Sequence, residues 1–359
     1  MNCVLSSRKG NTPSERGQWG HLTFLQLLEK RRWTALRFLP EREVLRQVWE
    51  ELGSITCLLV DSDTACIETL KRNGFTHTRH AKVEDVDFTP FAGVSLLCGG
   101  PPCQPWSLGG KDSGQGDERN GWESTLRAVE QCRPQAVLLE NVRGFLRPKF
   151  AAYRESIRER LEGMGYHLVT ESVNAKHYGV PQHRERVFIV GFLSLAARAA
   201  YVSPPATGRV VTVREALSPL GEPDGRNGHV LHGNARAYAG HTGSSLDGVA
   251  KTITSGANGL GGGANTLRLG DGSVRYFTVR EAATLQTFPT SYQFPETWTT
   301  AYRQIGNSVP VELAYVLGVA VAAALKSVPW LETFTGNNFS QRPAAPRQII
   351  SSHEAQDGG

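Results

Sequence analysis

Short apolar stretches alternate with segments of helical periodicity through the first half of the chain. Strands are predicted for residues 55–60, 94–97, 135–139, 167–173 and 186–192. Helices are predicted before and between them, over residues 24–52, 64–72, 123–131 and 150–164. Repeated β-α-β units of this kind predict an α/β fold in which a mostly parallel sheet is covered by helices on both faces.

The pattern changes at residue 193. From there to residue 276 the chain is rich in glycine, serine, threonine and asparagine and has only short apolar runs, which indicates a loop-rich second module. A flexible insertion is the alternative, but residues 249–254 alternate as a strand does. Helices are predicted over residues 279–286 and 311–325, and the second is so apolar that it must return to the core of the first domain.

Composition indicates a soluble globular protein. Hydrophobic residues make up 40% and charged residues 20% of 359 residues, and the net charge of +5 suits a polyanionic partner without requiring one. The 6 cysteines form no CxxC pair, so we expect neither a zinc site nor a disulfide framework. We see no leader segment and no membrane span, and we expect a cytoplasmic protein with disordered residues 1–20 and 331–359.

The candidate nucleophile is Cys103, in the stretch VSLLCGGPPCQPWSLGGK of residues 94–111. The predicted strand ends at Gly99 and Gly100, and the prolines around Cys103 restrict the backbone that carries the thiol. Ligands bind at the carboxyl ends of parallel strands in open α/β sheets, where this thiol is expected. A buried structural cysteine followed by a turn is the alternative, because free cysteine is usually a small core residue.

The string GGPPCQPWS resembles the nucleophile motif of the DNA cytosine-5 methyltransferases. Four further strings resemble motifs of that family in its order: Glu140-Asn141-Val142, QHRER at residues 182–186, REAATLQTFP at residues 280–289 and QIGNSVP at residues 304–310. The resemblance implies a Rossmann-like class I S-adenosylmethionine-dependent methyltransferase. Its catalytic domain would comprise residues 21–192 and 305–330, and residues 193–304 would form an inserted target-recognition domain and hinge.

The resemblance also implies the chemistry. Carbon 5 of cytosine becomes nucleophilic when a thiolate, here Cys103, adds to carbon 6. Glu140 would hold or protonate the ring at N3 and the amino group, and burial would give its carboxyl the raised proton affinity that a general acid needs. Arg184 would contact the cytosine and Arg186 the backbone or the loop. The target base must be flipped out of the duplex to be reached.

Further site residues follow from the same resemblance, which implies S-adenosylmethionine as cofactor, no metal, and double-stranded DNA as partner. The expected cofactor contacts are Asp61, Ser62, Val83, Pro102, Trp122, Asn307 and Ser308. The expected DNA contacts are Ser107, Gln182, Arg186, Lys251 and Thr252. We expect a monomer that either acts with a cognate restriction endonuclease, as a functional rather than a physical partner, or is an orphan methyltransferase.

The chain departs from the family at two cofactor motifs. The FxGxGG loop is absent, since no glycine lies between Gly20 and Gly53, and Lys82 stands where the family has an aspartate, for which Asp85 is the candidate substitute. Residues 38–53 can be interpreted as the missing motif translated in a shifted reading frame, or as an ordinary divergent helix. Charged side chains replace the glycines in both cases, so we expect weak binding of S-adenosylmethionine.

Two other functions are therefore compatible with the sequence. An RNA cytosine-5 methyltransferase would use the same chemistry, although the length of the insert favours DNA. A DNA-binding protein that flips bases but cannot load cofactor would explain the absent glycine loop.

Overall fold

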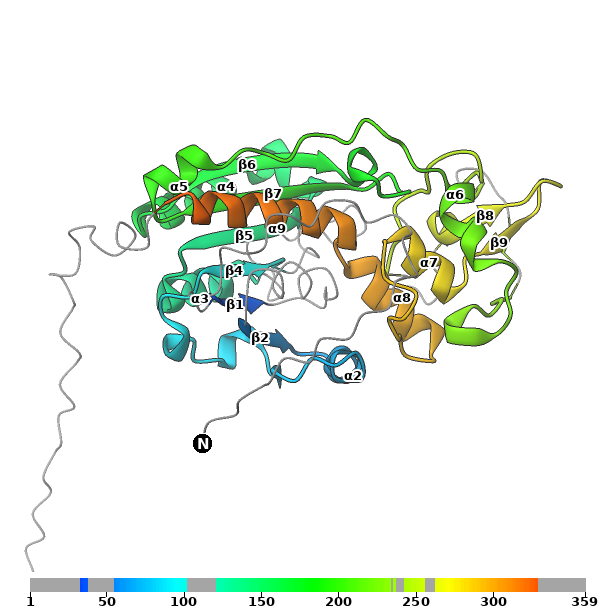
Figure 1. Ribbon diagram of the computed structural model, residues 1–359, viewed down its shortest axis with the longest axis horizontal. Coiled ribbons are helices and arrows are strands. Elements are labelled where there is room, and N and C mark those ends of the chain that lie inside the picture. Colours follow the sequence, from blue (N-terminus) through cyan, green and yellow to red (C-terminus); the bar gives the residue numbers. More distant parts are fainter. Residues whose placement is uncertain are drawn as a thin grey trace, which may run out of the picture.

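The computed structural model describes residues 33–37, 55–101, 121–233, 235–236, 242–255 and 262–328. These residues form a large lobe around one β-sheet and a small lobe beside it (Figure 1). We use "small lobe" for the described residues between 213 and 307, and "large lobe" for the others. The small lobe lies beyond the carboxyl ends of β4 and β5, the edge at which open α/β sheets bind ligands.

The large lobe contains a 7-stranded sheet in the order β3-β2-β1-β4-β5-β7-β6. Neighbours are parallel from β3 to β5, and β7 runs antiparallel to both β5 and β6. The strands are β1 (Trp33–Arg37), β2 (Ile55–Asp61), β3 (Thr78–His80), β4 (Leu96–Gly99), β5 (Ala136–Val142), β6 (His167–Asn174) and β7 (Glu185–Phe192). The mostly parallel sheet predicted from the sequence is confirmed.

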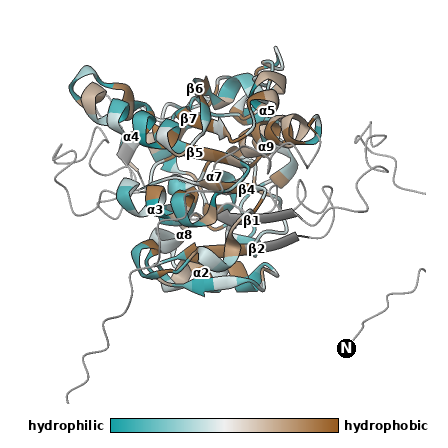
Figure 2. Ribbon diagram, turned by 90° about the vertical axis from the view of Figure 1, so that its left-hand side faces the viewer, coloured by the Kyte–Doolittle hydropathy of each residue, from teal (hydrophilic) through white to brown (hydrophobic). Residues whose placement is uncertain are grey.

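Helices cover both faces of this sheet, as Figure 2 shows with α3 and α4 on one side and α5 and α9 on the other. They are α2 (Thr64–Arg72), α3 (Trp122–Cys132), α4 (Ala151–Gly163), α5 (Leu195–Ala200) and α9 (Val311–Lys326). Because successive side chains of a strand point to opposite faces, Leu96 packs in the core under α9 whereas Leu97 packs in the core under α3. The two-layer cover predicted from the apolar pattern is therefore confirmed.

One predicted helix is wrong. Residues 33–37, inside the helix expected over residues 24–52, form β1, which hydrogen-bonds to both β2 and β4 near the middle of the sheet. The apolar positions that suggested a helix lie on either side of this strand, and nothing local separates Trp33–Arg37 from them. Pairing with two neighbouring strands decides the conformation there, as tertiary context often overrides local propensity. Residues 38–54 lie outside the described residues.

The small lobe consists of α6 (Val213–Leu217), β8 (Thr266–Arg268), β9 (Val274–Tyr276), α7 (Val279–Leu285) and α8 (Trp298–Asn307). The strand expected over residues 249–254 does not form. Among the described residues of that segment, Ala250 makes a single bridge to Gln182. Residues 195–200, expected in the recognition domain, form α5, which packs against α9 and β7 of the large lobe. The lobe boundary therefore lies after α5.

Residues 298–326 are helical and apolar enough to match the length of a membrane span, and 67% of the most apolar part is buried inside the protein. The run is divided into α8 and α9 at Ser308, where the chain leaves the helical conformation ahead of Pro310. The face of α9 that contains Leu313 and Leu317 belongs to the main core under the sheet. Burial in that core accounts for the apolar composition.

Candidate active site

Glu140 and Arg186 lie on one face of the sheet, at the carboxyl end of β5. In the antiparallel pair of β5 and β7, Val142 faces Arg186 and Glu140 faces Phe188, so Glu140 and Arg186 are diagonal neighbours on the same side. Arg186 Nε lies 2.8 Å from Glu140 Oε1, and their side chains are 11% and 14% exposed. A nearly buried carboxylate is thus held against a cation that can both orient it and bind an acceptor.

Burial raises the pKa of Glu140 above its ordinary value, while the positive charges of Arg186 and Arg184 act in the opposite direction. Burial has the largest effect because a carboxylate loses its hydration in the interior. The raised pKa agrees with the general-acid role expected for this residue from the sequence. The pairing with Arg186 places a carboxyl of raised pKa and a cation within one small site.

Arg184 does not share this environment, although it lies only two residues before Arg186. Its side chain is buried, and its guanidinium donates from Nη1 to the carbonyl of Ile253 at 2.8 Å and from Nη2 to the carbonyls of Gly306 and Ser308 at 2.8 and 2.7 Å. These are three backbone positions from two distant parts of the chain. The expected cytosine contact of Arg184 does not fit this geometry, because its terminal nitrogens already bind protein carbonyls.

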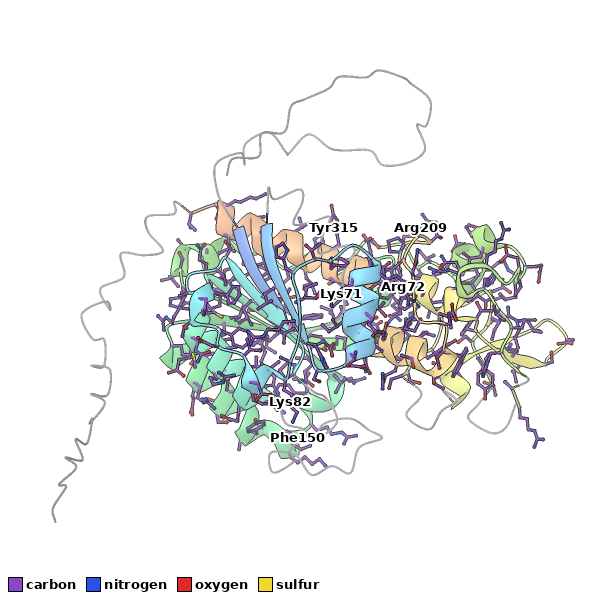
Figure 3. All side chains as sticks on the ribbon, turned by 90° about the horizontal axis from the view of Figure 1, so that it is seen from below. Lys71, Arg72, Lys82, Phe150, Arg209 and Tyr315 are labelled. Carbon is purple, nitrogen blue, oxygen red and sulfur yellow. The ribbon has the colours of Figure 1, made fainter. Side chains whose placement is uncertain are left out.

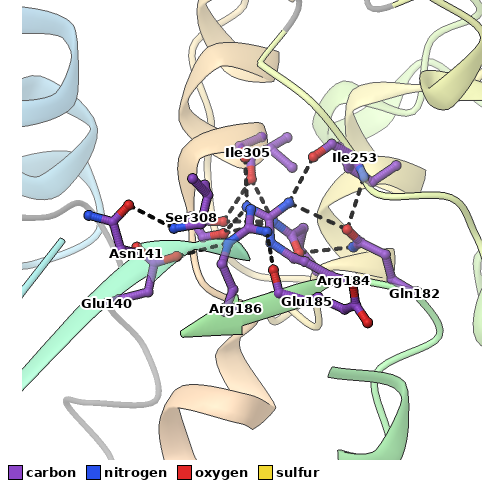
Figure 4. Close-up of polar contacts among 12 residues, drawn as sticks. Glu140, Asn141, Gln182, Arg184, Glu185, Arg186, Ile253, Ile305 and Ser308 are labelled. Carbon is purple, nitrogen blue, oxygen red and sulfur yellow. Dashed lines mark hydrogen bonds and ion pairs between the residues drawn. The ribbon is translucent and has the colours of Figure 1, made fainter. Parts of the chain in front are cut away.

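Two glutamines complete a buried group around Arg184 that we call the hub (Figure 4). Gln182 donates from Nε2 to Gln286 Oε1 at 2.9 Å and accepts the backbone N–H of Ile253 at 2.9 Å. Gln286 in turn donates to the carbonyl of Ile305 at 2.7 Å and to that of Ser308 at 3.1 Å. The hub consists of Gln182, Arg184, Gln286 and Ser308, and it joins β7 to both α8 and the segment at Ile253.

The sequence suggested that Gln182 contacts DNA. In the structure Gln182 is fully buried in the hub, so it is not available for that contact. Ser308 is buried as well, and its hydroxyl donates to the carbonyl of Ile305 at 2.7 Å, so its expected cofactor contact does not fit either. Asn307 beside it is exposed at the last position of α8. Gln182 and Ser308 thus join the two lobes, and the cofactor contact of Asn307 stays a prediction.

The segment expected to contact DNA runs along the hub without being a strand. Ala250 donates to the carbonyl of Pro181 at 2.9 Å, and the hydroxyl of Thr252 donates to the carbonyl of His183 at 2.6 Å. Lys251 and Thr252 keep half-exposed side chains while their backbone is held. The segment is therefore rigidly attached, with polar side chains left partly accessible.

Two residues that the sequence analysis missed fix the end of this segment. The amide of Asn265 accepts the N–H of Thr254 and donates to its carbonyl, both at 2.9 Å. Gly306 lies so close that a Cβ there would be 2.2 Å from the backbone nitrogen of Ser255. The signal for Gly306 was present in QIGNSVP, where a glycine inside a helical pattern indicates close backbone approach. No local pattern distinguishes Asn265.

Asp61 ends β2 at the edge where a doubly wound fold binds a ribose. Its Oδ1 accepts the N–H of Asp63 at 2.7 Å, which holds the carboxylate at the strand end. Ser62 follows it, and Val83 begins a turn after β3, the neighbouring strand. Asp61 and the turn at Val83 thus lie at the ends of neighbouring strands, and they are the described residues that would hold the adenosine half of S-adenosylmethionine.

Trp122 was expected to contact the cofactor, but it is fully buried at the start of α3 and stacks on Phe145 with ring centroids 5.3 Å apart. Its role in the structure is core packing between α3 and the turn after β5. Lys82 is exposed, and its Nζ lies 3.9 Å from Oε1 of Glu84. Asp85, which follows Glu84, is also exposed. Asp85 is thus accessible near Val83, as a substitute adenine contact requires.

Cys103, Pro102 and Ser107 lie outside the described residues, as do residues 38–53. Strand β4 precedes Pro102, Cys103 and Ser107 in the chain, and it ends at Gly99 next to β5. Leu97 pairs with Val137 and Gly99 with Leu139, so the exit of β4 neighbours Glu140. Within the described part of the chain no group of three or more histidine, cysteine, aspartate or glutamate side chains could hold a metal ion.

Comparisons with known proteins agree on one family. Residues 43–204 and 221–323 match the profile of the family described as C-5 cytosine-specific DNA methylase. The Type II methyltransferase M.AplI of Arthrospira platensis is 32% identical over 266 residues, which cover 70% of this chain and 75% of that protein. M.NgoMIV of Neisseria gonorrhoeae, also a Type II methyltransferase, is 34% identical over 253 residues, covering 66% and 80%.

Solved structures agree on the fold. A DNMT2 variant of Spodoptera frugiperda is 17% identical and superposes with a TM-score of 0.64, covering 81% of this chain and 99% of that one. At this identity the likeness concerns the arrangement of the elements. The matched family residues begin at 43, so strand β1 lies before the match.

Proposed function

The chain belongs to the C-5 cytosine-specific DNA methylase family, and from this premise we propose that it methylates carbon 5 of a flipped-out cytosine in a specific duplex site through a covalent Cys103 adduct. Its relatives are Type II methyltransferases, which supports DNA cytosine methylation within restriction-modification. The family uses S-adenosylmethionine, which supplies an electrophilic methyl group when bound.

The observation that carries the proposal is the Glu140–Arg186 pair. A carboxyl of raised pKa, 2.8 Å from a guanidinium, lies beside the strand that leads to Cys103. Cytosine presents a basic N3 and an acceptor O2 next to each other on its ring. We infer that Glu140 holds a proton at N3 and that Arg186, in place of Arg184, binds the ring oxygen.

In this proposal the Cys103 thiolate forms a bond to carbon 6, and the electrons of the carbon 5–carbon 6 double bond make carbon 5 nucleophilic. Protonation of N3 by Glu140 stabilises the resulting ring. Carbon 5 accepts the methyl group, then loses its proton to a base. The electrons of the former carbon 5–hydrogen bond re-form the carbon 5–carbon 6 double bond while the sulfur–carbon 6 bond breaks. N3 returns its proton to Glu140, and the aromatic ring and the thiolate are restored.

The hub gives the other arginine and its neighbours a supporting role. Gln182 and Arg184 hold the backbone of Ile253, and the half-exposed Lys251 and Thr252 precede it. We infer that Lys251 and Thr252 contact DNA while Gln182 and Arg184 keep their backbone in place. Recognition of the target site and the chemistry at Glu140 are then coupled through one buried group.

Sequencing after bisulfite treatment of DNA from an expressing host tests the proposal, because it reports methylation and target site together. We expect protected cytosines within one recurring sequence, and none with Cys103→Ser, since a hydroxyl is a far weaker nucleophile than a thiol at neutral pH. DNA binding by that variant should persist because phosphate contacts dominate affinity. Methylation by Cys103→Ser would contradict the proposal. Methylation of tRNA but not of duplex DNA, in parallel assays with both substrates, would contradict it as well.

A cofactor-deficient DNA-binding protein is the second candidate, favoured by the residues that follow β1. Charged Glu41, Arg42 and Glu43 stand where the family has glycines that allow backbone N–H groups to approach the cofactor. Under this alternative the chain as written binds S-adenosylmethionine weakly. Calorimetry on the purified protein decides between the two, and a micromolar dissociation constant would exclude the second candidate.

A further inference from the structure

Helix α2 is bonded to the small lobe at both of its ends. At its start, the N-cap residue Asp63 forms an ion pair with Arg303 of α8, with Oδ2 and Nη2 2.5 Å apart. At its end, the side chain of Asn73 donates to the carbonyl of Gln293 and accepts its N–H, both at 2.8 Å. Arg72 adds a hydrogen bond to the carbonyl of Phe294 at 3.2 Å.

The partners of α2 belong to the small lobe by their packing. Trp298 and Tyr302 of α8 stack on each other with centroids 4.1 Å apart, and Trp298 meets Tyr276 of β9 edge-on at 5.8 Å. The hydroxyl of Tyr302 donates to the carbonyl of Phe277 at 2.6 Å. Helix α8 therefore moves with the β8–β9 pair, and a bond from α2 to α8 is a bond between lobes.

On the side of the large lobe, this contact and the hub lie on different strands of the sheet. The hub attaches the small lobe to β7, whereas α2 follows β2, and three strands lie between β2 and β7 in the sheet. At about 4.8 Å per strand, β2 and β7 are roughly 19 Å apart across the sheet. Both contacts nevertheless reach α8, the hub at the carbonyls of Ile305 and Gly306 and α2 at Arg303. A hydrophobic core that contains residues of both lobes, such as Leu96 and Phe277, already packs the lobes together. The α2 contact adds polar bonds of defined direction on the side of β2.

The α2 contact is polar and partly exposed rather than packed. The side chains of Arg303 and Asp63 are 50% and 31% exposed. Next to it lies a cavity of about 810 Å³ to which Arg72 contributes from the large lobe and Val230 and Phe294 from the small lobe. Figure 3 shows Arg72 and Lys71 on α2 beside the small lobe. Exposed ion pairs contribute little to stability, so this contact is suited to setting orientation.

We propose that α2 is a two-ended latch, in which Arg303 and Asn73 are positioning residues that hold the small lobe in the orientation that sequence-specific DNA recognition requires. The inference rests on the proposed function, because the small lobe must read bases while the target cytosine reaches Glu140. Misplacement by about 1 Å can cost about a hundredfold in rate. Asp63 also lies two residues after Asp61, the expected ribose contact. The latch therefore connects the strand end at Asp61 to the small lobe.

The test compares Arg303→Met and Asp63→Asn, which change the net charge in opposite directions. The readout is the ratio of affinities for two duplexes of equal length, one carrying the sequence that the wild type selects from a random pool and one unrelated. Phosphate contacts are common to both duplexes and cancel in this ratio. Asparagine can still accept the N–H of Ala65, which Asp63 caps at 2.9 Å, so the start of α2 is kept.

We expect both variants to lower the ratio about tenfold, the cost of one poorly placed base contact, and the double variant to be no worse than either. Arg303→Lys should restore most of the ratio. Arg158→Met is the matched control, because Arg158 is 48% exposed and its ion pairs with Glu155 and Glu162 lie within α4. It should leave the ratio unchanged.

Ratios for Arg303→Met and Asp63→Asn within twofold of the Arg158→Met value, or moving in opposite directions, would overturn the latch. Thermal unfolding of each variant shows whether it folds. If Arg303→Met does not fold, Asp63→Asn and Arg303→Lys carry the comparison. A wild type without any sequence preference would instead refute the proposed function, and the latch with it, so the two failures are distinguishable.

Discussion

Two of the contacts between the lobes, the hub and the α2 latch, differ in chemistry. At the hub, Arg184 and Gln286 are buried and bind backbone carbonyls that no water can reach. At α2, Asp63 and Arg303 are partly exposed and bind each other in contact with solvent. A buried polar group left without its partner costs far more than an exposed one, so the hub should determine whether the lobes stay together and the latch how they are oriented.

The largest effect is expected for Arg184→Met. The substitution leaves the carbonyls of Ile253, Gly306 and Ser308 buried without this donor. The carbonyl of Ser308 keeps its bond from Gln286, so two carbonyls lose their donor. We expect the free energy of unfolding to fall by about 2 kcal/mol or more, at about 1–3 kcal/mol for each unsatisfied group. Urea denaturation measures it. Arg184→Lys should recover little, since an ammonium cannot reproduce the planar fork.

Gly306→Ala tests the close backbone contact beside the hub. The added methyl group would lie 2.2 Å from the nitrogen of Ser255 and 2.3 Å from the carbonyl carbon of Thr254, so the segment or α8 must move. Overpacking of this kind costs about 1–3 kcal/mol. Gly163→Ala is the control, because Gly163 also lies at a helix end and has nothing within 4 Å of the added Cβ. An equal loss of stability in both variants would show that the measurement reports only the effect of alanine on the helix, and not the close backbone contact at Gly306.

Glu140, next to the hub, should make stability depend on pH. Its pKa is raised above the ordinary value of 4.5 because its carboxyl is buried, so the native state keeps the proton longer than the unfolded chain. Stability should therefore fall as pH rises from the unfolded pKa to the raised native pKa, and the loss persists above it. Glu140→Gln, which cannot ionise, should lack this decrease as the pH rises above 4.5. Unfolding midpoints measured across that range test it.

The smallest effect on stability is expected for Arg303→Met. Loss of a half-exposed ion pair should change the free energy of unfolding by less than about 1 kcal/mol. Together with Arg184→Met, it compares one arginine at each attachment by the same urea denaturation. If Arg303→Met destabilised as strongly as Arg184→Met, the distinction between a buried hub and a polar latch would be lost.

The sequence by itself determined the family, the order of most strands and helices, and the residue types of the site. The apolar periods of α2 and α9 are local, and they predicted both helices almost to the residue. The motif strings likewise singled out Cys103, Glu140 and the two arginines as candidates without reference to the fold. Such features are readable because they depend on neighbours along the chain.

Only the tertiary structure decided what depends on residues far apart in the chain. Strand β1 forms because β2 and β4 flank it, although its own residues gave no strand signal. Arg184 and Arg186 are alike in sequence, yet Arg184 meets carbonyls more than 60 residues away whereas Arg186 meets Glu140 on the neighbouring strand. Packing brought these partners together, and a pattern of adjacent residues carries no record of it.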